Sequence, residues 1–301
     1  MHLSLSRLRY LYEVAQCGSM RAASEKMNVA PSSVSRQIAT LEDELGVGVL
    51  ERGRGTAKLT EAGEMVVRYY REDLTQKEML SSHLNDIRGL RRGTVTISMG
   101  EGYVSDLLSE SMQAFSTRYP EIQLDIRVSG TNQVLSMVEE DEAHIGMVFD
   151  CPPSPKISVQ KAYDQPLKAV MAADHKLANN KSLTLEQLSG CNCALPLKNF
   201  RIREIIDQAA LKEKVVISPT VTSNSLLILK NMAMTTNGAT ILPDIAILKE
   251  LKTGQLVSIP LASNSLSNTS AEIVTRLGRV LPIAARECLK YLQSYFNNEL
   301  A

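Results

Sequence analysis

The start of the chain carries three short stretches in which apolar side chains recur at helical spacing. Residues 5–16 have the i, i+3, i+4, i+7 pattern of an amphipathic helix. Gly18 is expected to end this helix, and Ser19 is placed to cap a second helix over residues 20–27. Pro31 is suited to open a third helix, because its missing N–H is not needed there. The apolar positions of the first helix are Leu8, Leu11, Tyr12 and Ala15.

The second and third predicted helices are joined by a short turn at Asn28-Val29-Ala30, which is the layout of a helix-turn-helix. A third helix that keeps Val34, Ile38 and Leu41 on one face presents polar groups on the other, and such groups can contact base edges in the major groove. A small helical bundle without nucleic acid would show the same stripes, so periodicity alone leaves both alternatives open. The candidate DNA contacts on this helix are Pro31, Ser32, Ser33, Ser35, Arg36 and Gln37.

The segment that follows the third helix is basic. Residues 52–58 carry Arg52, Arg54 and Lys58, no acidic residue, and two glycines suited to a tight hairpin. The alternative is a solvated charged turn. Because the segment adjoins the helix pair, we expect a wing whose three cations meet phosphate or the minor groove.

A long helix is predicted from Thr60, as N-cap, to about Gly89, since no proline interrupts this stretch. Its apolar stripe is partial, so the helix needs a partner surface to be stable. Two partners are possible: the same helix of a second copy, or the C-terminal part of its own chain. The stripe consists of Met65, Val66, Tyr69, Leu80, Leu84 and Ile87, and Arg88, Arg91, Arg92 and Gly93 follow as a polar hinge.

From residue 94 onwards strand-like and helix-like patterns alternate, which favours parallel sheets built from right-handed crossovers. Two such sets are expected, and the last strand and helix return to the first set, which leaves a cleft between two α/β units. The predicted strands are 95–99, 122–128, 145–149, 167–172, 215–221, 239–242 and 271–277, and the predicted helices are 103–118, 131–140, 200–211, 225–234 and 282–295.

The candidate ligand contacts in this cleft are the residues that directly follow the predicted strands or begin the next helix. Free amides at a helix start favour an anion, so a small carboxylate would fit near Thr131. The carboxylate of Glu101 would instead attract an amine, and the two features together indicate an amino-acid-like ligand. For each residue the alternative is a helix cap or a solvated loop. The candidates are Ser98, Gly100, Glu101, Gly102, Thr131, Phe149, Arg201, Arg203, Thr222 and Asn224.

Composition sets the class of protein. The 301 residues are 44% hydrophobic and 22% charged with a formal net charge of zero, which excludes disordered, coiled-coil and strongly basic chains. Neutrality does not argue against DNA, because residues 52–58 alone carry a charge of +3. The five cysteines are scattered, the N-terminal residues do not form a signal peptide, and no apolar run approaches roughly 20 residues. We therefore expect a soluble cytoplasmic protein that has no disulfide framework, no metal and no cofactor, and that does not bind a membrane.

An ordered string of residues between positions 22 and 63 resembles the winged helix-turn-helix of LysR-type transcriptional regulators. Pro31 stands where many members have a Gln that reaches DNA, and Leu50 stands where a Phe is usual. The substitution at position 31 shifts base contacts to the serines and Arg36, whereas Leu50 should refill a core site. The string comprises Ala22-Ala23, Val34-Ser35-Arg36-Gln37-Ile38, Leu41-Glu42, Leu45-Gly46, Arg52 and Leu59-Thr60-Glu61-Ala62-Gly63.

The resemblance implies an α/β chain with a helical N-terminal winged helix-turn-helix over residues 1–59, a linker and dimerisation helix with a hinge over 60–92, and a two-subdomain, periplasmic-binding-protein-like effector module over 93–301. Subdomain I would comprise about 93–162 and 267–301, and subdomain II about 163–266. The implied partners are double-stranded promoter DNA, a small-molecule effector, other copies of the chain in a dimer of dimers, and RNA polymerase if the protein is an activator.

Two other functions compete with ligand-responsive transcription regulation. A small-molecule binding or transport module would leave residues 1–92 unexplained. An enzyme on an α/β scaffold is not favoured, because the sequence has no phosphate-loop motif, no glycine fingerprint after a strand and no Gly-x-Ser-x-Gly elbow.

Overall fold

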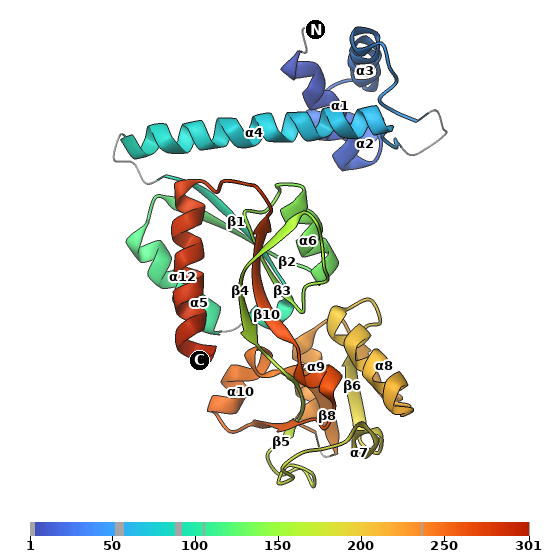
Figure 1. Ribbon diagram of the computed structural model, residues 1–301, viewed down its shortest axis with the longest axis vertical. Coiled ribbons are helices and arrows are strands. Elements are labelled where there is room, and N and C mark those ends of the chain that lie inside the picture. The colour runs from blue at the N-terminus through green and yellow to red at the C-terminus, as the bar shows by residue number, and fades with distance from the viewer. Residues whose placement is uncertain (1–3, 52–56, 88–91, 105, 236, 301) are drawn as a thin grey trace. The chain divides into compact units, whose positions relative to one another are not determined.

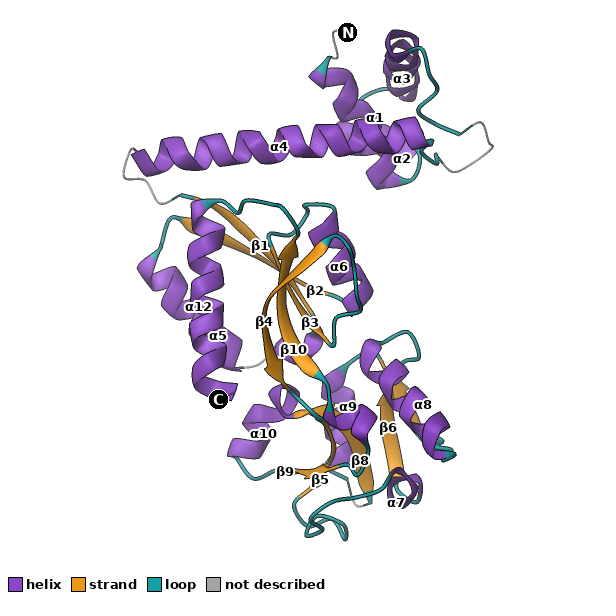
Figure 2. Cartoon of the chain, in the orientation of Figure 1, coloured by secondary structure: helices purple, strands orange, loops and turns teal. Residues whose placement is uncertain are grey.

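The computed structural model describes residues 4–51, 57–87, 92–104, 106–235 and 237–300. The chain divides into two compact units, Met1–Ser81 and Ser82–Ala301 (Figure 1). The first unit is built from helices, and the second contains two β-sheets with helices packed on them (Figure 2). No helix in the described part of the chain is both long enough and apolar enough to cross a membrane.

The helices of the first unit begin and end where local sequence signals place them. Gly18 adopts a left-handed conformation, with φ of 68°, at the end of the first helix. The Ser19 hydroxyl accepts a hydrogen bond from the backbone N–H of Ala22 at 3.1 Å, which caps the second helix. Pro31 occupies the first turn of the third helix. The helices are α1 (Leu5–Cys17), α2 (Met20–Met27), α3 (Pro31–Leu45) and α4 (Glu61–Ile87).

One hydrophobic core holds this unit together, and the start of α4 belongs to it through Val67 and Tyr70. Leu50 is partly buried against the same core, as expected for a smaller apolar group at that site. The residues on either side of the predicted wing pair in antiparallel fashion, and the Glu51 N–H donates to the Lys58 carbonyl at 2.8 Å. The predicted contacts Arg52 and Arg54 lie outside the described residues. The buried core residues are Leu8, Leu11, Val14, Ala23, Val34, Ile38, Leu41, Val49, Val67 and Tyr70.

Helix α4 is capped as predicted, because the Thr60 hydroxyl accepts from the Gly63 N–H at 3.1 Å. The helix is 27 residues long and ends at Ile87. Part of its predicted apolar stripe is exposed; we call these four residues, Met65, Tyr69, Leu80 and Leu84, the α4 stripe.

The first sheet of the second unit has the strand order β2-β1-β3-β10-β4. Its first three strands are mutually parallel, whereas β10 runs antiparallel to both of its neighbours. The helices α5 and α12 pack with β1 and β3 in one core, and α6 packs on the opposite face. The elements are β1 (Gly93–Met99), α5 (Asp106–Arg118), β2 (Ile122–Val128), α6 (Thr131–Glu139), β3 (Ile145–Phe149), β4 (Ile157–Asp164), β10 (Ser270–Arg276) and α12 (Ile283–Leu300), with a 3₁₀ turn η1 (Glu101–Tyr103).

The second sheet repeats this plan with the order β7-β6-β8-β5-β9, in which β7, β6 and β8 are parallel and β5 is antiparallel to β8 and β9. The chain crosses from the first sheet to the second after β4 and returns before β10. The elements are β5 (Leu167–Ala172), α7 (Leu185–Ser189), β6 (Asn192–Pro196), α8 (Arg201–Glu213), β7 (Val221–Ser223), α9 (Leu226–Ala233), β8 (Gly238–Pro243), η2 (Asp244–Ile247), α10 (Leu248–Lys252), β9 (Leu256–Pro260) and α11 (Asn264–Ser267).

The expectation of parallel sheets holds for three strands of each sheet, but β10 and β5 run antiparallel to both of their neighbours. Three of these ten strands, β4, β6 and β9, were not predicted, and the predicted strand 215–221 is largely wrong, because it overlaps β7 only at Val221. Strand β4 lies at a sheet edge and is largely exposed, so its polar composition hides it from a search for apolar runs. Strand β6 has only five residues and ends in a proline, and a short segment with a proline is more typical of a loop than of a strand.

Candidate functional site

Helix α3 separates an apolar side from a polar one. Val34, Ile38 and Leu41 are buried in the core of the first unit. The predicted contacts Pro31, Ser32, Ser35 and Arg36 are exposed, and Ser33 and Gln37 are half-buried. Lys58, the last residue of the predicted wing, is exposed. The helix therefore presents hydroxyl, amide and guanidinium groups outward, and these groups can donate to base edges and phosphates.

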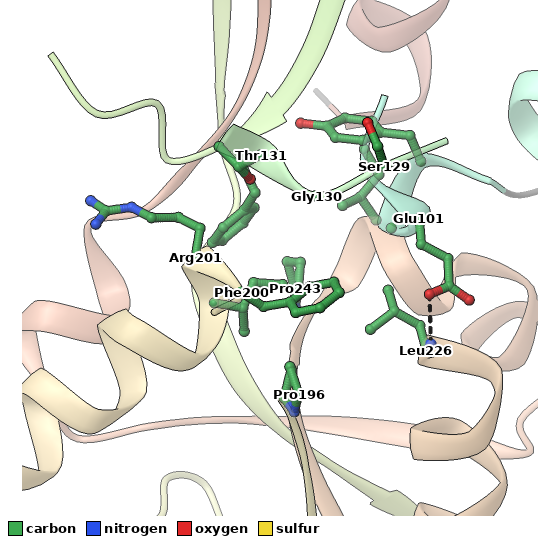
Figure 3. Close-up of a pocket in the computed structure, with 15 residues that line it drawn as sticks. Glu101, Ser129, Gly130, Thr131, Pro196, Phe200, Arg201, Leu226 and Pro243 are labelled. Atoms are coloured by element: carbon green, nitrogen blue, oxygen red, sulfur yellow. Dashed lines mark hydrogen bonds between the residues drawn. The ribbon is translucent and has the colours of Figure 1, made fainter. Parts of the chain in front are cut away.

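A small pocket with a cavity volume of about 50 Å³ lies in the second unit, between the two sheets (Figure 3). Its residues follow β1, β2 and β3 of the first sheet and β6 and β8 of the second, so it lies at the carboxyl ends of parallel strands, where α/β folds bind ligands. Its lining comprises Gly100, Glu101, Gly102, Tyr103, Ser129, Gly130, Thr131, Phe149, Pro196, Phe200, Arg201, Ile202, Leu226, Pro243 and Ile245.

Six of the ten predicted ligand contacts line this pocket: Gly100, Glu101, Gly102, Thr131, Phe149 and Arg201. The other four do not. Ser98 is fully buried, and its hydroxyl lies 3.4 Å from the sulfur of Met137. Arg203 is buried and donates to the Pro196 carbonyl and to Asp207, while Thr222 and Asn224 are exposed away from the pocket.

These four residues were selected by their place after a strand, which does not determine the side to which a side chain points. Successive side chains of a strand alternate between faces, so Ser98 lies on the opposite face of β1 from Ile97 and Met99 and points toward Met137 of α6. Arg203 lies two residues beyond Arg201 on α8, and a step of about 200° turns it away from the cleft.

Most of the pocket wall is apolar, which the sequence did not indicate. Phe200, Pro196, Pro243 and Leu226 lie around the space shown in Figure 3, and Phe149 also lines the pocket. Each proline ends a parallel strand, so prolines at strand ends were a usable signal once β6 had been recognised. The wall favours a ligand with an apolar body.

Both charged residues in the lining already have partners. The Glu101 carboxylate accepts hydrogen bonds from the Ser225 hydroxyl at 3.1 Å and the Leu226 N–H at 2.9 Å. The Arg201 guanidinium donates to the Asp150 carboxylate at 2.7 Å and to its carbonyl at 3.0 Å. Neither charged group is therefore available as the main contact for a charged ligand.

The polar groups near the pocket that have no such partners belong to the loop before α6. Gly130 is the N-cap of α6 and provides no side-chain cap, and no acidic residue lies in the first turn of this helix. The Ser129 hydroxyl oxygen is buried and has no hydrogen-bond partner in the described part of the chain. Helix-start amides with an unused hydroxyl beside them favour an anionic group.

Tyr103 also lines the pocket and is buried. Its hydroxyl donates to the Val148 carbonyl and accepts from the Glu272 N–H at 3.2 Å. Complete burial raises the pKa of Tyr103 far above its usual value, so the group stays a neutral donor.

Cys191 and Cys193 are buried free thiols. Burial raises the pKa of the Cys193 thiol to about 11 and also raises the pKa of Cys191. Within the described ranges, no three His, Cys, Asp or Glu side chains come together as a metal site would require.

Comparisons with known proteins cover both units. Residues 5–64 match the bacterial regulatory helix-turn-helix protein family of the lysR type, and residues 88–297 match the LysR substrate binding domain. The Hca operon transcriptional activator HcaR of Escherichia coli K12 is 28% identical over 264 residues, covering 87% of this chain and 88% of that protein. A probable RuBisCO transcriptional regulator of Chlorokybus atmophyticus is 25% identical over 291 residues, covering 94% and 92%.

Solved structures share the fold. A variant of full-length OxyR from Pseudomonas aeruginosa matches with a TM-score of 0.68 at 20% identity, covering 99% of this chain and 95% of that one. Full-length CbnR in complex with its target DNA matches with a TM-score of 0.57 at 17% identity, covering 97% and 100%. Because the two family matches together account for nearly all of the described residues, the chain belongs to the LysR family of DNA-binding transcriptional regulators, with an effector-binding substrate domain.

Proposed function

We propose that this protein binds promoter DNA sequence-specifically through α3 and the basic segment 52–58, and that a small molecule in the pocket of the second unit modulates this binding. The proposal rests on the outward polar face of α3, on which Ser32, Ser35 and Arg36 are exposed beside a buried apolar face. Arg36 is assigned the strongest base contact, because a guanidinium can pair in bidentate fashion with guanine.

The pocket supports a small carboxylate with an apolar body as the effector. Phe149, Phe200 and the two prolines provide apolar walls, and the start of α6 with Ser129 provides the anion-favouring end. The alternative of an amino acid required Glu101 to hold an amine, and this carboxylate is already engaged by Ser225 and Leu226. We therefore favour the carboxylate.

We further propose that the protein acts as a homo-oligomer, a dimer of dimers, in the cytoplasm, without catalytic activity, and that it contacts RNA polymerase if it activates transcription. The exposed α4 stripe supports self-association, because a long helix with an uncovered apolar side needs a partner. Edge strand β2 adds exposed Ile126 and Val128 in the second unit. Pairing two DNA-binding units also suits recognition of two half-sites.

The experiment that tests DNA recognition selects bound fragments from the genome of the source organism with the full-length protein and footprints them. Arg36→Ala should weaken binding to a selected operator by about 10- to 100-fold while leaving the thermal unfolding temperature unchanged. Arg9→Ala is the matched control, because it removes the same charge from an exposed position of α1 in the same unit. Equal affinity of Arg36→Ala and wild type would contradict the proposal.

A further inference from the structure

The two sheets of the second unit are joined through two adjacent chain crossings. The Gln165 N–H donates to the Thr269 carbonyl at 2.9 Å, and the Thr269 hydroxyl donates to the Gln165 carbonyl at 2.7 Å. These residues lie between β4 and β5 and between β9 and β10. Two short crossings bonded to each other are suited to act as a hinge for domain closure.

Away from these crossings, Glu101 bridges the pocket. It belongs to η1, which follows β1 of the first sheet, while its partners Ser225 and Leu226 begin α9 on the second sheet. Figure 3 shows the Glu101 side chain reaching across to the Leu226 amide. The bond is charge-assisted, and the N-terminus of a helix favours a negative group at this place.

Helix α9 depends on this carboxylate for its cap. Its N-cap residue, Ser225, makes no side-chain bond to the helix and donates its hydroxyl to Glu101 instead. The first turn of α9 contains no acidic residue. Glu101 therefore supplies from the opposite subdomain what an N-cap side chain normally supplies from the same helix.

The approach at this point is close. A Cβ atom added at Gly102 would lie 3.6 Å from a side-chain carbon of Leu226 and 3.8 Å from the Cβ of Ala246. The second bridge, between Arg201 and Asp150, joins α8 to the end of β3. Two carboxylates from the first-sheet subdomain, Glu101 and Asp150, thus bridge the cleft, and donors of the second-sheet subdomain hold both of them.

We propose that Glu101 caps α9 from across the cleft: its carboxylate binds at the start of that helix and holds the two subdomains in the closed arrangement. We call this contact the Glu101 latch. Glu101 is then a positioning residue that sets the balance between closed and open forms. The consequence for DNA rests on the proposed function, since a ligand shifts a conformational equilibrium only through its different affinity for the two forms.

The test is hydrogen exchange of the full-length protein with Glu101→Ala. The Leu226 amide loses its acceptor, so its exchange should accelerate by at least about tenfold, and the rest of α9 should open with it. Glu213→Ala is the control, because it removes one exposed acidic group from the subdomain that carries α9. This variant should leave exchange in α9 unchanged.

Rescue with a free carboxylate distinguishes the Glu101 latch from a purely structural role of this residue. Sodium acetate supplies a free carboxylate for the space that Glu101→Ala vacates, and it should restore protection of Leu226, whereas sodium chloride at equal ionic strength should not. Wild type should respond to neither salt. Unchanged exchange in Glu101→Ala, or loss of protection that acetate does not restore, would overturn the proposal.

If Glu101→Ala unfolds the second unit, Glu101→Gln takes its place, because the amide keeps the size and one acceptor oxygen and removes the charge. Faster exchange at Leu226 in Glu101→Gln supports the latch, and exchange equal to wild type refutes it.

Operator footprints of the same samples separate the proposed latch from the proposed function. An opened cleft with an unchanged footprint contradicts effector control and leaves the latch intact, whereas failure of wild type to bind any operator contradicts the proposed function alone.

Discussion

In the helical unit, the Glu42 carboxylate accepts a hydrogen bond from the backbone N–H of Val49 at 2.8 Å and a second, from Leu50, at 3.3 Å. Val49 and Leu50 follow the end of α3 and lead toward the predicted wing, and Leu50 pairs in antiparallel fashion with Leu59. The Glu42 side chain, three residues before the end of α3, therefore fixes the position of the segment that follows the helix.

We predict that Glu42→Ala destabilises the helical unit by about 1–3 kcal/mol, because it leaves the buried amide of Val49 without an acceptor. It should also weaken operator binding by displacing the basic segment. Urea unfolding followed by circular dichroism measures the first effect, and a gel-shift titration measures the second. Asp43→Ala, an exposed change of the same charge, is the control, and equal behaviour of the two variants would show that Glu42 has no such role.

A second prediction concerns the start of α4. A Cβ atom at Gly63 would lie 2.1 Å from the Val49 carbonyl oxygen, so Gly63→Ala must displace backbone. We expect a loss of about 1–3 kcal/mol, typical of overpacking, and a lower unfolding temperature of the helical unit in differential scanning calorimetry. Gly48→Ala provides a matched control, because its new Cβ would meet no atom closer than the Glu42 Oε1 at 3.6 Å. Similar unfolding temperatures for both variants would be inconsistent with this steric account.

The α4 stripe should control assembly. Changing Leu80 and Leu84 together to Glu places two charges on its exposed apolar side, which should convert the protein into a smaller oligomer in sedimentation velocity experiments. Arg68→Glu alters the net charge by the same two units at an exposed position about 120° and about 160° around the helix from Leu80 and Leu84, and should leave assembly intact. An unchanged sedimentation coefficient for the double variant would exclude this surface from the interface.

Buried thiols give a prediction about pH. Because burial raises the pKa of Cys193 to about 11, native protein at pH 8 should label at this residue on the order of 100-fold more slowly than an ordinary thiol. The folded form holds the proton more tightly than the unfolded form, so this contribution to stability is present at pH 7 and is lost as pH rises from about 8.5 toward 11. Mass spectrometry after labelling with a disulfide reagent identifies the reacting cysteine.

The same burial argues that Cys191 and Cys193 do not sense oxidants. Operator binding should respond to peroxide identically in wild type and in the protein with both residues changed to Ser. A difference between the two proteins would indicate that local opening exposes these thiols.

The sequence predicted the helical unit well. Ser19, Pro31 and Thr60 act on residues within one turn of themselves, so their effects do not depend on the rest of the fold. The α4 stripe was also evident, because helical periodicity shows an apolar side whether or not it is covered. The cleft was predicted from strands that alternate with helices.

The sheets and the pocket were predicted less completely. Strand β4 is stabilised by pairing with β10, more than 100 residues away in the chain, and its own side chains are mostly exposed. The walls formed by Pro196 and Phe200 could not be identified, because their position depends on how two sheets face each other.

Glu101 illustrates the division between the two levels. Its place after a strand predicted that it would lie at the pocket, and the sequence suggested that it would bind a ligand amine. Only the tertiary structure determined that its carboxylate caps α9 from the opposite subdomain, 125 residues further along the chain. Helix caps and apolar stripes depend on neighbouring residues and can therefore be predicted from the sequence. The hydrogen-bond partner of a charged side chain is determined only when the tertiary structure brings distant helices within hydrogen-bond distance.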